Sequence, residues 1–513
     1  MSTFGAVNEK PDKEMTNYFY DMIPAEELGQ MPYIPTVPEF LDFIGRQYPQ
    51  YPALTDINRP EKSVNYAQLV ENVARRRAFL NGLGLEEGAK VAVFDFNSVD
   101  AVEMFLAVTS AGYTAVILPP QLPAPAVAGS CARFDISAVM VGEALKGATE
   151  GLSIKVCPIT SIAETPAAAA KVDKDAPAAI FFTGGTTGVP KGAILPHRAL
   201  LRGSFNGAFM PCSILHNHRT IGMLPLSHVF GLIKGTMSCL YSGNEWVACE
   251  DMKATIGKLP AIQPTFLTLV PGLCDILYGL TRMYTPNFLG GKLKIIISGA
   301  ANVPPRLIKA FDEMGIGLLG GYGLTEGANF TSGNADVKTH PTSVGKLYPE
   351  QQIRFVDGEI QLKGDNIFLG YYKDPANTEA AFTEDGWFRT GDLGRMDDDG
   401  FLYITGRIKN LIILANGENI SPESIEEPFY KCDALRDCLV KEDIMNGESV
   451  IAIDILPQPA FVEGKSEEEV NAFFHKLVDD INATLPTTHR VTKVTVRKED
   501  FKRTGSLKVS RNQ

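Results

Sequence analysis

The chain has 513 residues, a length at which at least two domains and a large core are expected. Hydrophobic residues make up 45% and charged residues 21%, which excludes a disordered or fibrous chain. The formal net charge of -12 argues against nucleic-acid binding, because no basic stripe would neutralise phosphates, but it leaves small nucleotides open.

The cysteine spacing and the N-terminal residues indicate the cellular location. Eight cysteines are scattered without a CxxC pair, which indicates reduced thiols and argues against a zinc site or a disulfide framework. The first residues are acidic and polar where a secretory signal needs a basic start and an apolar run. Every apolar stretch is shorter than the ~20 residues of a membrane-spanning helix. We therefore expect a cytoplasmic protein without an integral membrane segment.

From residue 90 the sequence alternates between apolar strands and helical patterns. A strand over 91–96, a helix over 98–113 and a strand over 114–120 form a predicted βαβ unit. Such alternation predicts parallel sheets covered by helices. Further apolar runs lie at 136–141, 178–182, 265–270, 293–297 and 317–319.

The pattern changes twice in the C-terminal third. After Val344, short alternating segments with Gly and Asp turns predict a compact antiparallel or barrel-like unit. Beyond residues 406–409, a hairpin-like segment precedes a helix that Ser421 can cap, with Pro422 at its first position. The rest predicts a small α+β domain, with strands over 438–441, 450–456 and 491–496 and a helix over about 466–485.

The strongest local signal is FTGGTTGVPKG at 182–192, directly after an apolar strand. Glycines let backbone N–H groups turn inward, threonine hydroxyls donate to phosphate oxygens, and a lysine adds charge. Pro190 and Gly192 distinguish the segment from a Walker loop. A surface linker is the alternative, although linkers seldom follow a buried strand so closely. The predicted phosphate contacts are Thr183, Gly184, Gly185, Thr186, Thr187, Gly188 and Lys191.

This segment resembles the phosphate loop of the acyl-adenylate-forming (AMP-binding) superfamily, which includes acyl-CoA synthetases, peptide-synthetase adenylation domains and luciferases. Further motifs follow in that superfamily's order, so the resemblance extends from about residue 35 to the C-terminus. They are LPLSHVFG (224–231), ISGAA (297–301), GYGLTEG (321–327), WFRTGDLG (387–394), GRIKNLIILANGENISP (406–422) and KRTGSLKVSR (502–511).

The resemblance implies an α/β fold. A large N-terminal domain over residues 1–407, with two helix-flanked sheets and a small β-barrel-like unit, would precede a small, mobile α+β domain over 408–513. Lys409 matches the hinge position between the two domains. The C-terminal domain would rotate there after adenylation.

The same resemblance implies how a nucleotide is held. Tyr322 offers a ring for a purine, Thr325 would contact the α-phosphate, and Glu326 would bind magnesium, a metal that prefers oxygen ligands. Without the flanking motifs, Glu326 would be an ordinary solvated acid and Asp392 an ordinary turn residue. The other implied nucleotide contacts are Gly321 and Gly323, the small residues Gly299, Ala300 and Ala301 beside the adenine, and Asp392 and Arg407 at the ribose.

Two residues would serve the acid. Lys508 matches the lysine that offsets the repulsion between the attacking carboxylate and the α-phosphate, where charge builds in the transition state. His228 is implied to line or gate the acyl pocket, whereas a lone histidine is otherwise more often structural. Two positions depart from the superfamily's pattern: Gly184 stands where serine is usual, and Leu507 where glycine is usual.

We therefore predict an ATP-dependent acyl-CoA synthetase that uses magnesium and coenzyme A and activates a hydrophobic acid of medium or long chain. The alternatives are an enzyme that loads a carrier protein, a nucleotide-binding protein without turnover, and a luciferase-like oxidase. The segments expected near the acid mix Gly, Ala, Leu and Phe. Lys234, in an apolar helical run, either snorkels or meets a second polar group on the substrate, and the sequence leaves both open.

Overall fold

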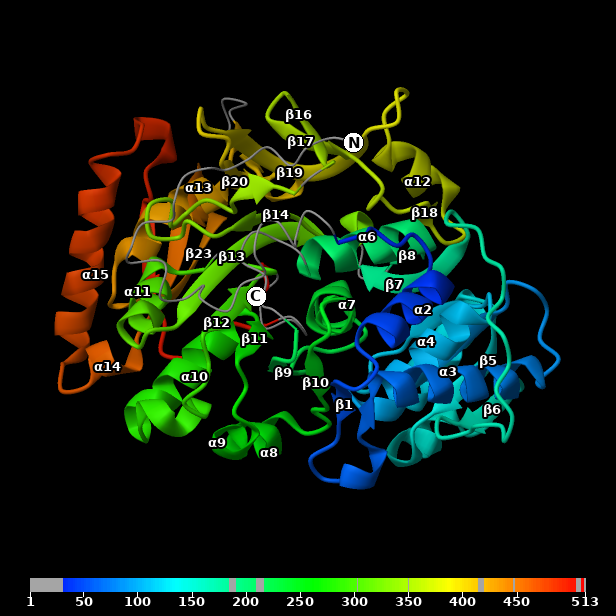
Figure 1. Cartoon of the computed structure of the whole chain (residues 1–513). Helices are drawn as coiled ribbons and strands as arrows, with labels where there is room; N and C mark the ends of the chain where they lie inside the picture. Colours follow the sequence, from blue (N-terminus) through cyan, green and yellow to red (C-terminus); the bar gives the residue numbers. More distant parts are fainter. Residues whose placement is uncertain are drawn as a thin grey trace.

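A computed structural model describes residues 31–183, 191–208, 216–301, 303–348, 350–413, 419–445, 448–503 and 509–511. Figure 1 shows the N-terminal helices and strands at the right, a second sheet beside them, antiparallel strands above, and the C-terminal elements at the left. The predicted class, a large α/β unit followed by a small α+β unit, is confirmed.

The first sheet has seven strands in the order β18-β8-β7-β4-β3-β5-β6. Strands β7 to β6 run parallel, whereas β8 and β18 are antiparallel additions at one edge. The predicted βαβ unit is confirmed, because α4 (Val99–Ser110), capped by Ser98, joins β3 to β4. The strands are β3 (Lys90–Phe94), β4 (Thr114–Ile117), β5 (Ile136–Val141), β6 (Lys155–Pro158), β7 (Pro177–Thr183), β8 (Lys191–Pro196) and β18 (Gly370–Tyr371).

The second sheet has five strands in the order β11-β12-β13-β14-β15. Its first three strands are parallel and alternate with α10 and α11, which confirms the second helix-flanked sheet. The elements are β11 (Phe266–Leu269), α10 (Pro271–Met283), β12 (Ile295–Ser298), α11 (Pro305–Glu313), β13 (Gly317–Leu324), β14 (Asn329–Asn334) and β15 (Lys346–Leu347). A short 3-10 turn, η6 (Thr325–Gly327), joins β13 to β14.

A further sheet of four short strands, in the order β2-β1-β10-β9, was not predicted. Leu54 of β1 pairs with Trp246 of β10, a partner far along the chain that no local pattern marks. The strands are β1 (Pro52–Thr55), β2 (Val64–Asn65), β9 (Arg219–Ile221) and β10 (Glu245–Val247). Remaining helices of the large unit are α2 (Val37–Gln47), α3 (Tyr66–Asn81), α5 (Ala124–Arg133), α6 (His197–Ala208), the π-helix η4 (Phe230–Met237), α7 (Ser238–Tyr241), α8 (Met252–Gly257), α9 (Leu259–Ile262) and α12 (Pro375–Ala381).

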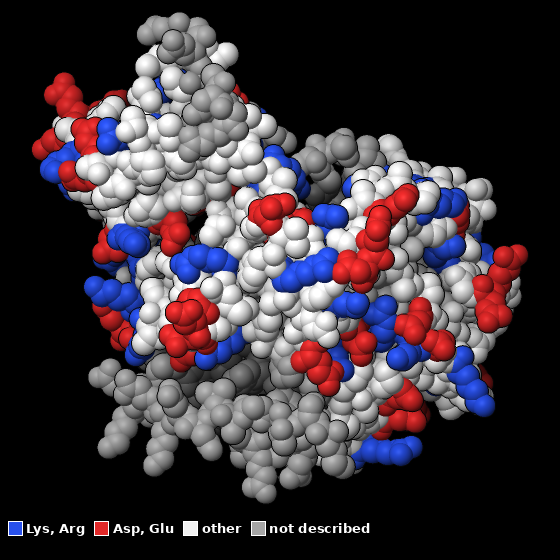
Figure 2. All heavy atoms as spheres, turned by 90° about the horizontal axis from the view of Figure 1, so that it is seen from above, with Lys and Arg blue, Asp and Glu red and all other residues white. Residues whose placement is uncertain are grey.

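The antiparallel unit expected after Val344 is a sheet in the order β16-β17-β19-β20. Its strands are β16 (Gln352–Val356), β17 (Glu359–Lys363), β19 (Phe388–Met396) and β20 (Leu402–Arg407). These strands lie at the top of Figure 1, and Figure 2 shows basic and acidic side chains interspersed on that face. Opposite charges also pair within the unit, as in Arg354 with Asp385 at 2.6 Å. Such exposed pairs add little stability.

The C-terminal elements have their own apolar core. Helix α15 begins with a capping box, in which Ser466 accepts from the Glu469 N–H and the Glu469 side chain accepts from the Ser466 N–H. The predicted strands and helix are confirmed as β23 (Leu435–Met445), β24 (Glu448–Pro457), β25 (Lys493–Val496) and α15 (Glu467–Asn482). Shorter elements are β21 (Ile412–Ile413), β22 (Asn419–Ile420), α13 (Pro422–Glu426) and α14 (Pro459–Val462).

The predicted cap of α13 needs a correction. Ser421 occupies the N-cap position and Pro422 the first turn, but the Ser421 side chain makes no capping hydrogen bond. Its hydroxyl instead lies 2.7 Å from the Thr405 carbonyl oxygen, to which it donates, and 3.0 Å from a Glu423 carboxylate oxygen. The hydroxyl is oriented by these two acceptors, and its oxygen accepts no hydrogen bond from the first helical N–H groups. Ser421 therefore ties the C-terminal unit to β20.

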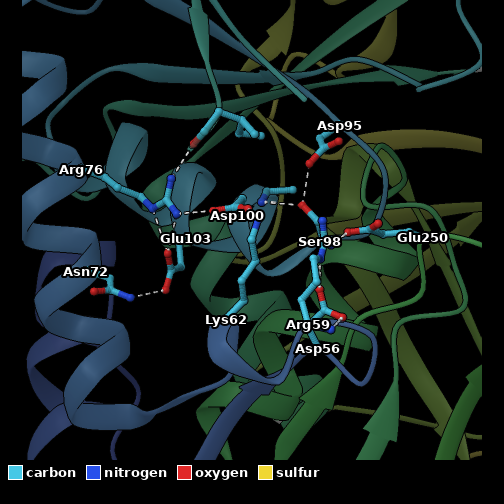
Figure 3. Close-up of polar contacts among 12 residues, drawn as sticks. Asp56, Arg59, Lys62, Asn72, Arg76, Asp95, Ser98, Asp100, Glu103 and Glu250 are labelled. Carbon is cyan, nitrogen blue, oxygen red and sulfur yellow. Dashed lines mark hydrogen bonds and ion pairs between the residues drawn. The ribbon is translucent and has the colours of Figure 1, made fainter. Parts of the chain in front are cut away.

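A buried ionic network joins α3 to α4 (Figure 3). Arg76 donates to Glu103 at 2.8 Å, to Asp100 at 2.5 Å and to the Ile159 carbonyl at 2.5 Å. Lys62 donates to Asp100, and Asn72 to Glu103. Burial raises the pKa of Glu103, while the pKa of Asp100 is lowered because bonds from Lys62 and Arg76 outweigh its burial. Every charge in this network thus has a partner of opposite sign.

Candidate active site

Tyr371 connects two of the predicted site residues. Its phenol donates to a Glu326 carboxylate oxygen at 2.8 Å, and the Lys191 ammonium lies 4.7 Å from the centre of its ring. Lys191 also donates to the Asn377 amide oxygen at 2.6 Å. Tyr371 reaches this position because β18 pairs with β8, setting it opposite Ala193. A cation and a carboxylate predicted to serve ATP are thus held by one aromatic side chain.

Asp392 is the centre of a second group. It is 1% exposed and accepts from the Tyr322 hydroxyl at 2.7 Å and from the Arg407 guanidinium. Strand pairing explains the contact, because Asp392 of β19 lies opposite Arg407 of β20. Burial raises the pKa of the Tyr322 hydroxyl, so it remains a hydrogen-bond donor. An ionised carboxylate accepts about four hydrogen bonds, which leaves capacity for a ribose.

Non-glycine residues with positive φ lie at two of the predicted motifs. Ala300, just beyond the end of β12, has φ 69°, and Ala328 and Asn329, just after η6, have φ 49° and 95°. Residues with a Cβ rarely adopt positive φ, and such strain collects at functional sites. Gly299 is buried and its N–H faces the Leu269 carbonyl at 3.3 Å, while Ala300 is half-buried and Ala301 exposed. Ligands of open α/β sheets bind beyond such strand ends.

The phosphate-loop residues Gly184, Gly185, Thr186, Thr187 and Gly188, together with Lys508 and Leu507, lie outside the described residues. Both ends of the loop are described. Thr183 closes β7 and is directly opposite Lys191 at the start of β8, so the segment leaves and re-enters one antiparallel pair. The described ends of this segment thus lie close to Tyr371, because the Lys191 ammonium faces its ring.

The remaining predicted residues are spread over nearby turns. Thr325 and Glu326 are half-buried in η6, between Gly323 and the strained residues. His228 is exposed in the turn before η4, where its N–H donates to the Pro225 carbonyl. Lys409 is exposed in the turn that follows Arg407. Gly321 pairs with Gly333 across β13 and β14.

Sequence reasoning missed Tyr371 and Asn377. Asn377 lies in the first turn of α12 and its amide nitrogen donates to both oxygens of Asp374, the helix N-cap, at 2.9 and 2.8 Å. That bond orients the amide oxygen toward Lys191. The Asp-Pro start of α12 is a visible capping signal. Its link to the phosphate loop is a long-range contact and leaves no local pattern.

Comparison with known proteins identifies the chain's relatives. The model of the AMP-binding enzyme family matches residues 42–372. The chain belongs to this AMP-binding family. The model of the AMP-binding enzyme C-terminal domain matches residues 409–513. The strained turns, Tyr371 and the ends of the glycine-rich loop therefore fall within the family's main domain.

Relatives of this AMP-binding enzyme are CoA ligases. The indoleacetate–CoA ligase of Aromatoleum aromaticum is 28% identical over 81% of this chain and 88% of its own length. A methyl-dioxo-octahydroindenyl-propanoyl:CoA ligase of Mycobacterium tuberculosis is 30% identical over 79% and 85%. The long-chain-fatty-acid–CoA ligase of Bacillus subtilis is 32% identical over 59% and 56%. Family and relatives together identify the class of the enzyme as AMP-forming acid–CoA ligase.

Solved structures share the fold. The ATP-bound RpMatB-BxBclM chimera B1 aligns with a TM-score of 0.79 and 25% identity, covering 93% of this chain and 97% of its own. An anthranilate CoA ligase in complex with anthranoyl-AMP aligns with a TM-score of 0.81 at 18% identity, covering 94% and 97%. At that identity the second likeness concerns the fold alone.

Proposed function

We propose that the enzyme activates a hydrophobic carboxylic acid of medium or long chain and transfers the acyl group to coenzyme A. A carboxylate oxygen attacks the α-phosphorus of ATP, and the bond from that phosphorus to the bridging oxygen breaks, releasing pyrophosphate. The coenzyme A sulfur then attacks the acyl carbon, AMP leaves, and the thiol proton passes to solvent. The observation that supports the adenylation step is the Lys191–Tyr371–Glu326 arrangement beside the ends of the glycine-rich segment. The hydrophobic acid is supported by the buried apolar side chains of η4, which begins two residues after His228.

The nucleotide contacts stay proposals, supported by the site geometry. The loop residues and Thr325 would donate hydrogen bonds to phosphates, and Tyr322 would pack on the base beside Gly299 to Ala301. Asp392, which is paired with Arg407 and Tyr322, would accept hydrogen bonds from the ribose hydroxyls. We also propose the division into residues 1–407 and 408–513, with the hinge at Lys409. Ser421 and its bond to Thr405 lie next to that division.

Magnesium fits the residues present. Glu326 has hard carboxylate oxygens, and Tyr371 fixes the orientation of one of them. Bound with ATP, the metal would neutralise charge on the phosphates. Glu326 would hold it together with phosphate oxygens, while Thr325 positions the α-phosphate.

The location of the enzyme is a separate matter. In the described part of the chain, none of the helices combines the length and the apolar character needed to cross a bilayer. A cytoplasmic location remains a prediction from the scattered cysteines.

The function is tested by ATP–pyrophosphate exchange with purified protein, Mg²⁺ and a panel of acids from acetate to long-chain and aryl acids. We expect exchange with one class of hydrophobic acid, followed by acyl-CoA formation when coenzyme A is added. Exchange without acyl-CoA, but with acyl transfer to a phosphopantetheine-bearing carrier protein, would support the carrier-loading alternative. ATP binding without exchange for any acid would contradict the proposal.

Replacing Tyr371 with phenylalanine should weaken magnesium use. The change keeps the ring under Lys191 but removes the hydroxyl that orients Glu326. Loss of such a supporting bond commonly weakens metal binding by at least about 10-fold. We expect the Mg²⁺ concentration for half-maximal exchange to rise by about that factor.

Tyr372→Phe is the matched control. The neighbouring Tyr372 hydroxyl also donates to a carboxylate, Asp135 at 2.6 Å, but away from the predicted site. The control should show the wild-type dependence on Mg²⁺. Equal dependence in the Tyr371 variant would argue that Glu326 does not serve the metal.

A further inference from the structure

The π-helix η4 buries a lysine. Lys234 is 5% exposed, and its ammonium donates to the Gly207 carbonyl near the end of α6. Around it on η4 are apolar, buried side chains, among them Leu232, Ile233 and Met237. π-helical turns are rare and are found frequently at functional sites. A positive charge is therefore buried among apolar side chains where η4 packs against α6.

Two glycines of α6 allow close contacts with the elements around this lysine. A Cβ at Gly207 would lie 2.2 Å from the Ser238 hydroxyl and 3.0 Å from the Lys234 Cδ. A Cβ at Gly203, one turn earlier, would lie 1.9 Å from the Ala328 carbonyl oxygen. Only glycine permits such an approach. One face of α6 thus contacts both η4 and Ala328, the residue directly after η6, which contains Thr325 and Glu326.

Two buried amide donors on these elements lack an acceptor. Asn206, between the two glycine contacts, is 3% exposed, and Asn329, the first residue of β14, is 2% exposed. The side-chain nitrogens of both are buried without a hydrogen-bond partner. Asn329 also holds φ 95°, an unfavourable conformation. Buried donors are nearly always satisfied, so two orphans on α6 and β14, the two elements that pack against η4, indicate that a ligand supplies the acceptor.

We infer that Lys234, Asn206 and Asn329 bind a second carboxylate at the far end of the acid substrate, so that the enzyme selects dicarboxylic acids with an apolar middle. The inference rests on the proposed function. All three side chains donate hydrogen bonds, and one carries a positive charge, which matches an anionic acceptor. The apolar residues of η4 would contact the chain between the two carboxylates. A plain fatty acid would leave both amides unpaired.

The test compares decanoate with sebacate, the dicarboxylic acid of the same length, and with the monomethyl ester of sebacate. We expect the wild-type enzyme to use sebacate with a kcat/KM for exchange at least about 10-fold above decanoate. Lys234→Met, which keeps an unbranched side chain as far as Cε and removes the charge, should lower the value for sebacate by about 100-fold and preserve that for decanoate. Lys155→Met, at an exposed position on β6, is the control and should leave both values unchanged.

Asn206→Leu covers the case that the lysine variant fails to fold, as judged by its melting temperature. It keeps the branching and the number of heavy atoms, removes one donor, and should lower the sebacate value by about 10-fold, with decanoate unaffected. A wild-type preference for decanoate, or an equal loss for both acids in a folded variant, would overturn the inference and leave adenylation intact. No exchange with any acid would contradict the proposed function and this inference with it.

Discussion

Lys508→Ala is expected to lower acid-dependent ATP–pyrophosphate exchange by about 100- to 1,000-fold. The attacking carboxylate and the α-phosphate are both anions, and negative charge builds between them in the transition state. The chain on either side of Lys508 is anchored. Arg503 pairs with Asp437 at 2.7 Å, and Arg511 pairs with Glu426 at 2.9 Å. These pairs hold both flanks of the lysine segment on the C-terminal core.

The proposed role of Lys508 can be tested separately from folding and from the second step. Lys498→Ala, which breaks only the exposed pair with Glu467, serves as the control and should exchange at the wild-type rate. Formation of acyl-CoA from acyl-adenylate supplied ready-made should survive in the Lys508 variant. An unchanged exchange rate in that variant would refute the assignment of this lysine to adenylation.

Arg76→Met is expected to cost about 3–5 kcal/mol of stability, the typical result of breaking a buried ion pair. The change leaves Glu103 and Asp100, with side chains 2% and 10% exposed, without the guanidinium that binds them both. It also frees the Ile159 carbonyl, so the segment directly after β6 loses its bond to α3. Calorimetry should record a fall in melting temperature of roughly 5 °C, because a unit of this size has a large unfolding entropy.

An exposed pair provides the comparison. Arg46 and Asp42 lie 3.7 Å apart with side chains 84% and 70% exposed, and Arg46→Met should change stability by less than about 0.5 kcal/mol. Adding Glu103→Gln to Arg76→Met should recover part of the loss, because one uncompensated charge is removed. A melting temperature as little affected by Arg76→Met as by Arg46→Met would mean that water already screens the network.

Several features followed from local sequence. The βαβ unit at Lys90 was predicted because an apolar run, a capping serine and a helical pattern lie next to one another, and Ser98 does cap α4. The order of the motifs was enough to indicate the AMP-binding family. Ser421 shows where local reasoning is wrong: a cap that the sequence permits was lost to the Thr405 carbonyl, which strand β20 brings near.

Local patterns thus predicted most of the long helices and strands, their order along the chain and the family, since these depend on residues a few positions apart. The three-dimensional packing was needed to find the partners of the side chains. It placed Tyr371 between Lys191 and Glu326, paired Asp392 with Arg407, and left Asn206 and Asn329 unsatisfied on the elements that pack against η4. Contacts between distant segments depend on strand pairing and on the packing of whole elements, and neither leaves a periodic pattern in the sequence.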